Sequence, residues 1–405
     1  MRSEWKMAPL PDLLSFIVDN RGKTVPTSDN GRKLIATNCV RNDTLYPVYE
    51  KVRYLSDETY KTWFRSHPIP GDILFVNKGT PGRVCMVPDP VDFCIAQDMI
   101  AFRTNKRMYN KFLFAVLRSP EIQMQIYNTN VGDVIPHFKK SFLDQLLIPE
   151  PDMETQKEIG DIYFSLSNKI ELNNKINANL EAQAQAIFKS WFVDFEPFQD
   201  GEFVDSELGK IPKGWKIKPL TDIAQYLNGL AMQKYRPKED EKGIPVLKIK
   251  ELRQGKCDDS SELCSYNLKP EYIVNDGDVI FSWSGSLMVD IWCGGKCGLN
   301  QHLFKVTSNE YDKWFYYFWT KHHLEKFVAI AAGKATTMGH IKRNDMESAL
   351  VLVPGKNIYD QLNSILNPMI DQIVKNKVQS RTLAAIRDTL LPKLMSGETE
   401  VPLAE

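Results

Sequence analysis

Several features of common protein classes are missing from this chain of 405 residues. None of its 22 glycines stands in a Gly-x-Gly pair, which excludes the common glycine-rich loop for S-adenosylmethionine or a dinucleotide. Its seven cysteines include no Cys-x-x-Cys, and their odd number indicates reduced thiols in a cytoplasm. No apolar run reaches the roughly 18 residues of a membrane span, and the amino terminus lacks a signal-peptide core. We therefore expect neither membrane insertion nor secretion.

Motifs for catalysis are incomplete or absent. Residues 333–337 superficially suggest a phosphate-binding loop, but position 328 is Val rather than the required Gly. The Asn/Asp-Pro-Pro-aromatic tetrapeptide of amino-methyltransferases does not occur, and no Pro-Asp pair is closely followed by the Asp/Glu-x-Lys of nucleases. Cys293, Cys297 and His302 could in principle hold a metal ion, although buried structural cysteines are a much commoner reason for such a group. The sequence thus favours a protein without a catalytic centre or metal site.

What the chain does contain is an internal duplication with an offset of about 203 residues. Gly-Asp followed by three apolar residues at 71–75 recurs at 277–281, and a His-apolar-basic-basic sequence at 137–140 recurs at 340–343. Further matches are Ala96-Gln97 with Asn300-Gln301, residues 109–111 with 311–313, and Pro151 with Pro354. Two similar modules suit a protein that reads something with two parts.

Each module is followed by the pattern of one long amphipathic helix, with apolar residues at steps of three, four or their sums. Each pattern covers about 36 residues, or about 54 Å at 1.5 Å per residue. A narrow apolar stripe needs a partner, so we expect the two repeats to pack as an antiparallel pair about a pseudo-twofold axis. The expected seam is Ile159, Ile162, Leu166, Ile170, Ile176, Leu180, Ala184, Ile187 and Trp191 in the first helix, and Leu362, Ile365, Met369, Ile373, Leu383, Leu390 and Leu394 in the second, with Gln379 and Arg387 as polar mismatches.

The fold class that these patterns predict is α+β, as two similar globular modules separated along the chain by long coiled-coil helices. Short apolar runs bounded by Gly, Asp or Pro look like strands at 73–76, 84–87, 246–249 and 279–283, whereas 112–117 and 314–319 look helical. The expected order is a first module at 1–151, a central helix at 152–196, a linker and second module at 197–355, a second helix at 356–396 and a tail at 397–405.

Charge is unevenly distributed although the net charge is zero. Both modules carry a small excess of Lys and Arg, whereas residues 152–205 are acidic. This pattern permits a polyanion to touch the modules and to avoid the first helix. A solvated surface explains charges of this size equally well.

Several motifs together resemble specificity subunits of type I restriction-modification systems. They are the stretch Gln-Ala-Ile-Phe-Lys-Ser-Trp-Phe-Val-Asp-Phe-Glu-Pro-Phe at 185–198, Ile-Pro-Lys-Gly-Trp at 211–215, Gly-Asp-Val-Ile-Phe at 277–281 and Leu-Leu-Pro-Lys-Leu-Met-Ser-Gly at 390–397. The likeness covers essentially the whole chain. One departure is the start of the first module, which has Met-Ala-Pro-Leu at 7–10 in place of Pro-x-Gly-Trp.

The resemblance implies that two target recognition domains read a bipartite site in double-stranded DNA while the helices hold them apart. It implies two methyltransferase (M) and two endonuclease/translocase (R) subunits as partners, in the cytoplasm of a prokaryote. It also implies no catalytic centre and no cofactor on this chain, with S-adenosylmethionine, ATP and Mg²⁺ on the partners. Two alternatives stay open: a coiled-coil scaffold without DNA contact, and a fused methyltransferase-nuclease.

Candidate DNA contacts lie beside the repeated motifs, and each has an ordinary structural alternative. Basic side chains after the two histidines would hold phosphate, unless they belong to solvated turns. Turns after equivalent strands carry different side chains, which would give different base readout. The candidates are Lys139, Lys140, Lys342 and Arg343 after the histidines, Lys78, Arg83 and Ser284 in the turns, and Lys234 and Arg236 in a separate basic segment.

Overall fold

The architecture was obtained as a computed structural model that describes residues 5–20, 22–95, 97–129, 136–333, 339–396 and 398. The chain divides into two compact units, which are Met1–Leu172 with Thr382–Glu405, and Asn173–Arg381. Ala96, residues 334–337 of the incomplete phosphate loop, and the predicted tail at 397–405 apart from Glu398 lie outside the described residues. In the described ranges no helix is long and apolar enough to cross a membrane.

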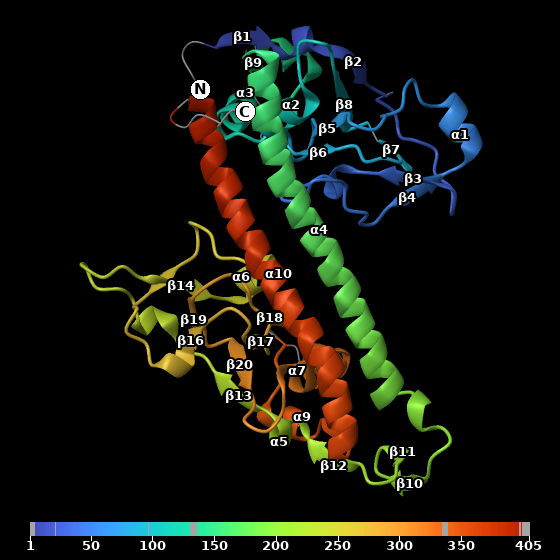
Figure 1. Cartoon of the computed structure of the whole chain (residues 1–405), viewed down its shortest axis with the longest axis vertical. Coiled ribbons are helices and arrows are strands. Elements are labelled where there is room, and N and C mark those ends of the chain that lie inside the picture. The colour runs from blue at the N-terminus through green and yellow to red at the C-terminus, as the bar shows by residue number, and fades with distance from the viewer. Residues whose placement is uncertain are drawn as a thin grey trace. The chain divides into compact units, whose positions relative to one another are not determined.

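Two long helices each contribute one part to each unit (Figure 1). They are α4 (Met153–Phe192) and α10 (Lys356–Ser396), of 40 and 41 residues. We call the part of unit 1 that precedes α4 module 1, and the part of unit 2 between α4 and α10 module 2.

Module 1 contains three groups of paired strands. Its strands are β1 (Lys6–Pro9), β2 (Leu14–Val18), β3 (Arg32–Ile35), β4 (Arg53–Leu55), β5 (Ile73–Val76), β6 (Val84–Met86), β7 (Phe93–Ile95), β8 (Met99–Thr104) and β9 (Leu147–Glu150), and its helices are α1 (Asp57–Thr62), α2 (Asn110–Leu117), α3 (Pro120–Thr129) and the 3₁₀ turns η1 (Leu10–Leu13), η2 (Thr37–Cys39) and η3 (Lys140–Gln145). One antiparallel sheet has the order β2-β8-β5-β6, a second has the order β4-β3-β7 with β3 and β7 parallel, and β1 pairs with β9.

Module 2 repeats these three groups in the same order. Its strands are β12 (Lys216–Pro219), β13 (Gln225–Asn228), β14 (Ile244–Leu247), β15 (Leu263–Cys264), β16 (Ile273–Val274), β17 (Val279–Ser282), β18 (Met288–Ile291), β19 (Cys297–Leu299), β20 (Leu303–Thr307) and β21 (Leu350–Val353), and its helices are α5 (Leu220–Ile223), α6 (Ile249–Gln254), α7 (Lys313–His322), α8 (Leu324–Gly333), α9 (Arg343–Glu347), η5 (Met232–Lys234) and η6 (Pro270–Tyr272). The sheets have the orders β13-β20-β17-β18 and β15-β14-β19-β16, and β12 pairs with β21. The predicted duplication is therefore confirmed, and within these three groups only β16, at the edge of the second sheet of module 2, lacks a counterpart among the strands of module 1.

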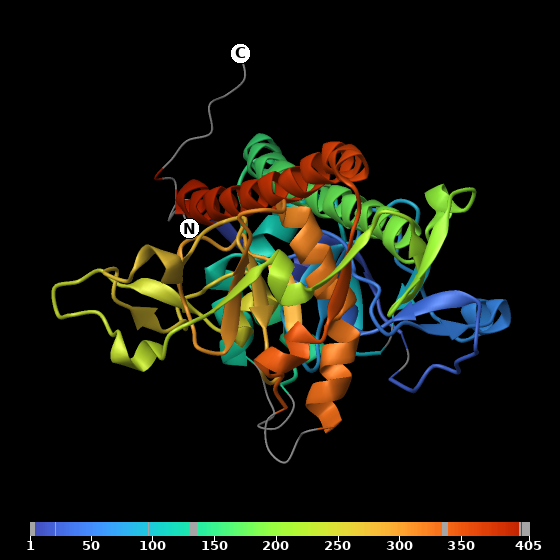
Figure 2. The same cartoon turned by 90° about the horizontal axis from the view of Figure 1, so that it is seen from below.

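Two features have no repeated counterpart or differ from expectation. The linker at the start of module 2 forms η4 (Glu196–Phe198) and a hairpin of β10 (Phe203–Ser206) and β11 (Gly209–Pro212). The strand expected at 246–249 begins and ends two residues earlier, as β14. Figure 2 shows the sheet that contains β14, in yellow, as a lobe beside the orange helices of module 2.

The repeated Gly-Asp motif forms the turn that leads into the central strand of each module. Gly71 and Gly277 have φ of 85° and 89°, a backbone conformation that costs glycine little. Asp72 and Asp278 each accept a hydrogen bond from the backbone N–H three residues earlier, at 2.9 and 2.8 Å. The motif recurs because both copies need the same turn, so the repeat at this place is structural.

The central strands are buried on both faces. Ile73 and Phe75 of β5 point into a core that they share with α2, α4 and α10. Leu74 and Val76 face a second core, which they share with the smaller sheet. Alternate side chains of a strand lie on opposite faces, and two covered faces produce a continuous apolar run. The run therefore predicted a strand correctly, although alternation of apolar and polar residues was missing.

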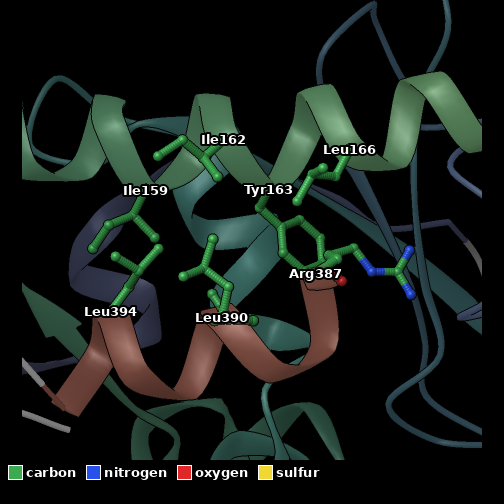
Figure 3. Close-up of a pocket in the computed structure, with 8 residues that line it drawn as sticks. Ile159, Ile162, Tyr163, Leu166, Arg387, Leu390 and Leu394 are labelled. Atoms are coloured by element: carbon green, nitrogen blue, oxygen red, sulfur yellow. The ribbon is translucent and has the colours of Figure 1, made fainter. Parts of the chain in front are cut away.

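The long helices pack on the modules as well as on each other. In unit 1, Figure 3 shows Ile159, Tyr163 and Leu166 of α4 facing Arg387 and Leu390 of the antiparallel α10. The hollow between them holds only about 10 Å³ of free space, which is too little for a ligand. The guanidinium of the polar mismatch Arg387 lies over the ring of Tyr163, 5.4 Å from its centroid.

Unit 2 holds the other part of each helix. Phe188 and Phe192 of α4 pack their rings on α7, with centroid distances of 5.1 and 5.6 Å to Trp319. Leu362 and Leu366 of α10 are fully buried in the same core. The predicted antiparallel packing is thus present within each unit, and each helix shares its apolar stripe between a module and the other helix.

The predicted seam is wrong at two isoleucines. Ile176 and Ile365 are 44% and 40% exposed, whereas Leu366, next to Ile365, is buried. Steps of three and four residues run through Leu362, Leu366, Ile370, Ile373 and Asn376. Ile365 lies at the edge of this stripe, about 100° around the helix from Leu366. Of the remaining seam residues, Ile159, Ile170, Ala184, Leu362, Ile373 and Leu394 are buried, and Ile162, Leu166, Leu180, Ile187, Trp191, Met369, Leu383 and Leu390 are partly buried.

A buried polar layer takes the place of the expected apolar contacts near the middle of the helices. Asn173, Asn177 and Asn376 are 0%, 8% and 6% exposed. Nδ2 of Asn376 donates to Oδ1 of Asn177 at 2.9 Å, and Nδ2 of Asn173 donates to Oε1 of Gln379 at 2.9 Å. A paired polar layer in an apolar stripe fixes the register of two helices, because a slip would leave its donors and acceptors unpaired.

Candidate nucleic-acid interface

Both modules build the same backbone frame at the end of their central strand. Lys78 forms an isolated antiparallel bridge with His137, and Ser284 forms the same bridge with His340. The N–H of the glycine that follows each turn residue donates to a carbonyl before each histidine, at 2.9 and 3.0 Å. We call residues 77–83 with 136–140, and residues 283–287 with 339–343, the turn surface of module 1 and of module 2. The structure therefore brings together the two repeated motifs that the sequence singled out.

The turn surface of module 1 presents free and paired cations. Lys78 and Lys139 are exposed and make no ion pair with any residue that the structure describes. Lys140 is paired with Asp19, which offsets its charge. Arg83 is partly buried, with its backbone carbonyl accepting from the N–H of Val76 at 2.9 Å.

The turn surface of module 2 differs from the prediction at Ser284. This side chain is only 4% exposed, and its hydroxyl lies 3.1 Å from Nδ1 of His302. This burial leaves little of the Ser284 side chain open to DNA and places its hydroxyl beside His302 instead. Lys342 is exposed at the start of α9, and Arg343 is exposed but paired with Glu347 at 3.1 Å.

An aromatic cluster occupies the place in module 2 where module 1 has an amide. The ring of Trp283 stacks on Phe304 with centroids 5.6 Å apart, and its Nε1 donates to Asn228 at 3.1 Å. Its centroid also lies 6.2 Å from His302. The matching residue in module 1 is Asn77, which is 5% exposed. Similar backbone frames therefore carry different chemistry.

A polar hollow of about 530 Å³ adjoins the turn surface of module 2. Three cations and one carboxylate line it. The carboxylate of Glu262 accepts a hydrogen bond from Arg236 at 3.0 Å and also pairs with Lys248. The hydrogen bond and positive charge of Lys248 hold the pKa of Glu262 below its usual value, and the charge of Arg236 adds a smaller effect in the same direction. The hollow is lined by Met232, Gln233, Arg236, Lys248, Ile249, Lys250, Glu262, Asn300, Gln301 and His302.

Comparison with known proteins decides the family. Residues 3–182 and 212–380 match the family described as Type I restriction modification DNA specificity domain. The chain belongs to this family. It is 28% identical to the type I restriction enzyme MjaIX specificity subunit of Methanocaldococcus jannaschii, over 82% of this chain and 78% of that one. It is 22% identical to the HindI specificity subunit of Haemophilus influenzae, over 81% and 86% of the two chains.

The fold of the specificity subunit is also found in a solved relative. The type I restriction-modification S subunit of M. genitalium covers 96% of each chain with a TM-score of 0.55 at 14% identity. The two matched segments correspond to the two repeats, because each contains one module and part of the helix that follows it.

The polar hollow is the feature of this specificity subunit that sequence reasoning missed. The sequence identified Arg236 and also Lys234, which is exposed nearby without an ion-pair partner among the described residues. It did not identify Lys248 and Lys250, because these residues lie at a strand end and in a short helix that carry no repeated motif. The available signal was Gln301, which recurs in the duplication.

The thiols and the metal candidates have ordinary surroundings. All seven cysteines are free, and six of them are buried. Across the described ranges, no three His, Cys, Asp or Glu side chains are grouped so that they could hold a metal ion. Cys293 and Cys297 pack in two different apolar cores of module 2, and His302 faces Ser284.

Proposed function

We propose that this specificity subunit reads a bipartite target in double-stranded DNA, with one half-site contacted by each module. The observation that carries the proposal is the backbone frame built twice with different residues on it. A bridge to a histidine supports Lys78 in one module and Ser284 in the other, and Asn77 is replaced by Trp283. Equal frames with unequal side chains suit two half-sites of different sequence. Exposed Lys78, Lys139, Lys234 and Lys342 would hold phosphates.

The chain acts in this proposal with other subunits of a restriction-modification complex. We propose two methyltransferase and two endonuclease/translocase subunits, with S-adenosylmethionine, ATP and Mg²⁺ bound by these partners and no catalytic centre on this chain. Family membership and the incomplete catalytic motifs support this division of roles. The complex would act in the prokaryotic cytoplasm, where its DNA lies.

Exchange of one module tests independent reading. Replacing residues 215–350 with the matching part of a relative keeps module 1 and the whole of α4 and α10. In complex with the methyltransferase partner, the chimera should methylate a site in which one half differs and the other is unchanged. Equal change in both halves would contradict independent modules. A chain that stays indifferent to every duplex, even with its partner, would favour the scaffold alternative, and S-adenosylmethionine turnover by this chain alone would favour a fused enzyme.

A further inference from the structure

The polar hollow of module 2 is held on a rigid backbone. Leu230 forms a parallel bridge with Asn300, and its carbonyl accepts from the N–H of Gln301. Gly229 lies so close that a Cβ there would stand 2.2 Å from the carbonyl oxygen of Asn300, so only glycine fits. The N–H of His302 donates to Oδ1 of Asn300 at 3.2 Å. Residues 300 and 301 are thus held on one side by the chain at 229–230 and on the other by β14, where the carbonyl of Leu247 accepts from the N–H of Asn300 at 3.2 Å.

The side chains around the hollow divide into two chemical classes. Arg236, Lys248 and Lys250 are cations that outnumber Glu262, and Nζ of Lys250 donates to Ser260 at 2.7 Å. Cations bind phosphate oxygens without regard to sequence. Amides and imidazole instead match the donors and acceptors of base edges in the major groove.

From this arrangement we infer that Gln301 and His302 are specificity-determining residues, which contact base edges of the module 2 half-site while Arg236, Lys248 and Lys250 hold the adjoining phosphates. The inference rests on the proposed function and deepens it. Ser284 is a positioning residue, because its hydroxyl lies 3.1 Å from Nδ1 of His302.

The other module supplies a matched pair of positions. In the strand register, Ser282 lies opposite Leu303 and Val76 lies opposite Met99. The residues just before these partners are Gln301-His302 and Gln97-Asp98. A glutamine is shared, but a neutral imidazole has one donor and one acceptor whereas a carboxylate only accepts. The two modules should therefore require different bases at this place.

Variants at matched positions of the two modules test whether Gln301 and His302 contact bases, in the complex with the methyltransferase partner. Gln301→Leu removes the amide at similar size, His302→Asp copies module 1, and Gln97→Leu is the matched control. Each complex would be produced in a host without adenine methylation, and its methylated sites would be mapped. Gln301→Leu should lower methylation of the wild-type site about tenfold or more and relax one base pair of one half-site. His302→Asp should change the preferred base in that same half, and Gln97→Leu should act on the other half alone.

Phosphate contact has a separate signature. Lys250→Ala should weaken binding to all duplexes about equally and reduce the salt slope of the binding constant by about one. Glu262→Gln removes the carboxylate that occupies Arg236 and Lys248, so it should tighten binding to any sequence.

The outcomes separate the inference from the proposed function. If the wild-type complex methylates a bipartite site and folded Gln301→Leu and His302→Asp leave that half-site unchanged, the hollow is not the reading surface. If they alter the half-site that Gln97→Leu alters, the assignment to module 2 is wrong. If the wild-type complex methylates no bipartite site, the proposed function fails. Should Gln301→Leu not fold, Gln301→Glu carries the same test at nearly equal shape.

Discussion

Lengthening the long helices should change the distance between half-sites by a calculable amount. The best place for an insertion is the boundary between the units, after Leu172 in α4 and after Arg381 in α10. All contacts within each unit then stay intact, including the asparagine layer and the bidentate pair of Arg381 with Asp276 at 2.7 and 2.8 Å. Leu172 is 46% exposed, so the insertion begins at the solvent.

Four residues in both helices add about 6 Å and rotate the helix by about 40° beyond one full turn. Two base pairs of B-DNA add about 6.8 Å and about 70° of twist. We therefore expect a spacer longer by one or two base pairs with both half-site sequences unchanged. Insertion into α4 alone should lengthen the spacer by one base pair at most, because α10 keeps its length and contacts residues of both units.

The assay is the methylated motif of each variant in complex with the methyltransferase partner. One residue inserted at both places is the control, since it adds only about 1.5 Å but rotates the helix by about 100°. That variant should lose site-specific methylation while each unit stays folded. An unchanged spacer in a well-folded four-residue variant would refute the idea that these helices set the distance.

Three further predictions concern folding. Phe188→Ala should destabilise unit 2 by about 3–5 kcal/mol in denaturant unfolding because the ring is buried against α7, whereas Gln185→Ala on the exposed face should change stability by less than about 0.5 kcal/mol. Asn376→Ala should cost about 1–3 kcal/mol, because it leaves a buried amide oxygen without its donor; an unchanged denaturation midpoint would show that the polar layer contributes nothing. Burial lowers the pKa of His323 to about 4, so the unfolded chain takes up this proton first as the pH falls, and stability should decline between about pH 6.5 and pH 4. His323→Gln should remove that part of the pH dependence, and an identical pH profile would contradict its origin.

Local sequence patterns predicted the strands and helices that form one continuous apolar run between turn residues. The strands at 73–76 and 279–282 and the helices at 110–117 and 313–322 follow from apolar runs and turn residues. Of the strands in the smaller sheets only β14 was expected, because these strands of two to four residues join distant segments such as 32–35 and 93–95. Pairing at that distance leaves no periodic signal.

Leu366 in the seam and His302 near the turn surface were missed for a common reason. Ile365 fits a helical step from Leu362, but so does Leu366, and packing on module 2 selects Leu366. Likewise, the duplication drew attention to Ser284 while His302, beside it in space, is 18 residues further along the chain. Side chains that converge from separate strands become visible only once the sheet register is known.

The sequence methylated by the wild-type complex tests the central claim most directly. The chain and its methyltransferase partner would be expressed in a host without adenine methylation, and every methylated adenine of the genome would be mapped. Two half-sites of different sequence, separated by a gap of fixed length and unspecified bases, are the result that two unequal modules on paired helices predict. A single uninterrupted motif, two identical half-sites, or a gap of variable length would contradict it.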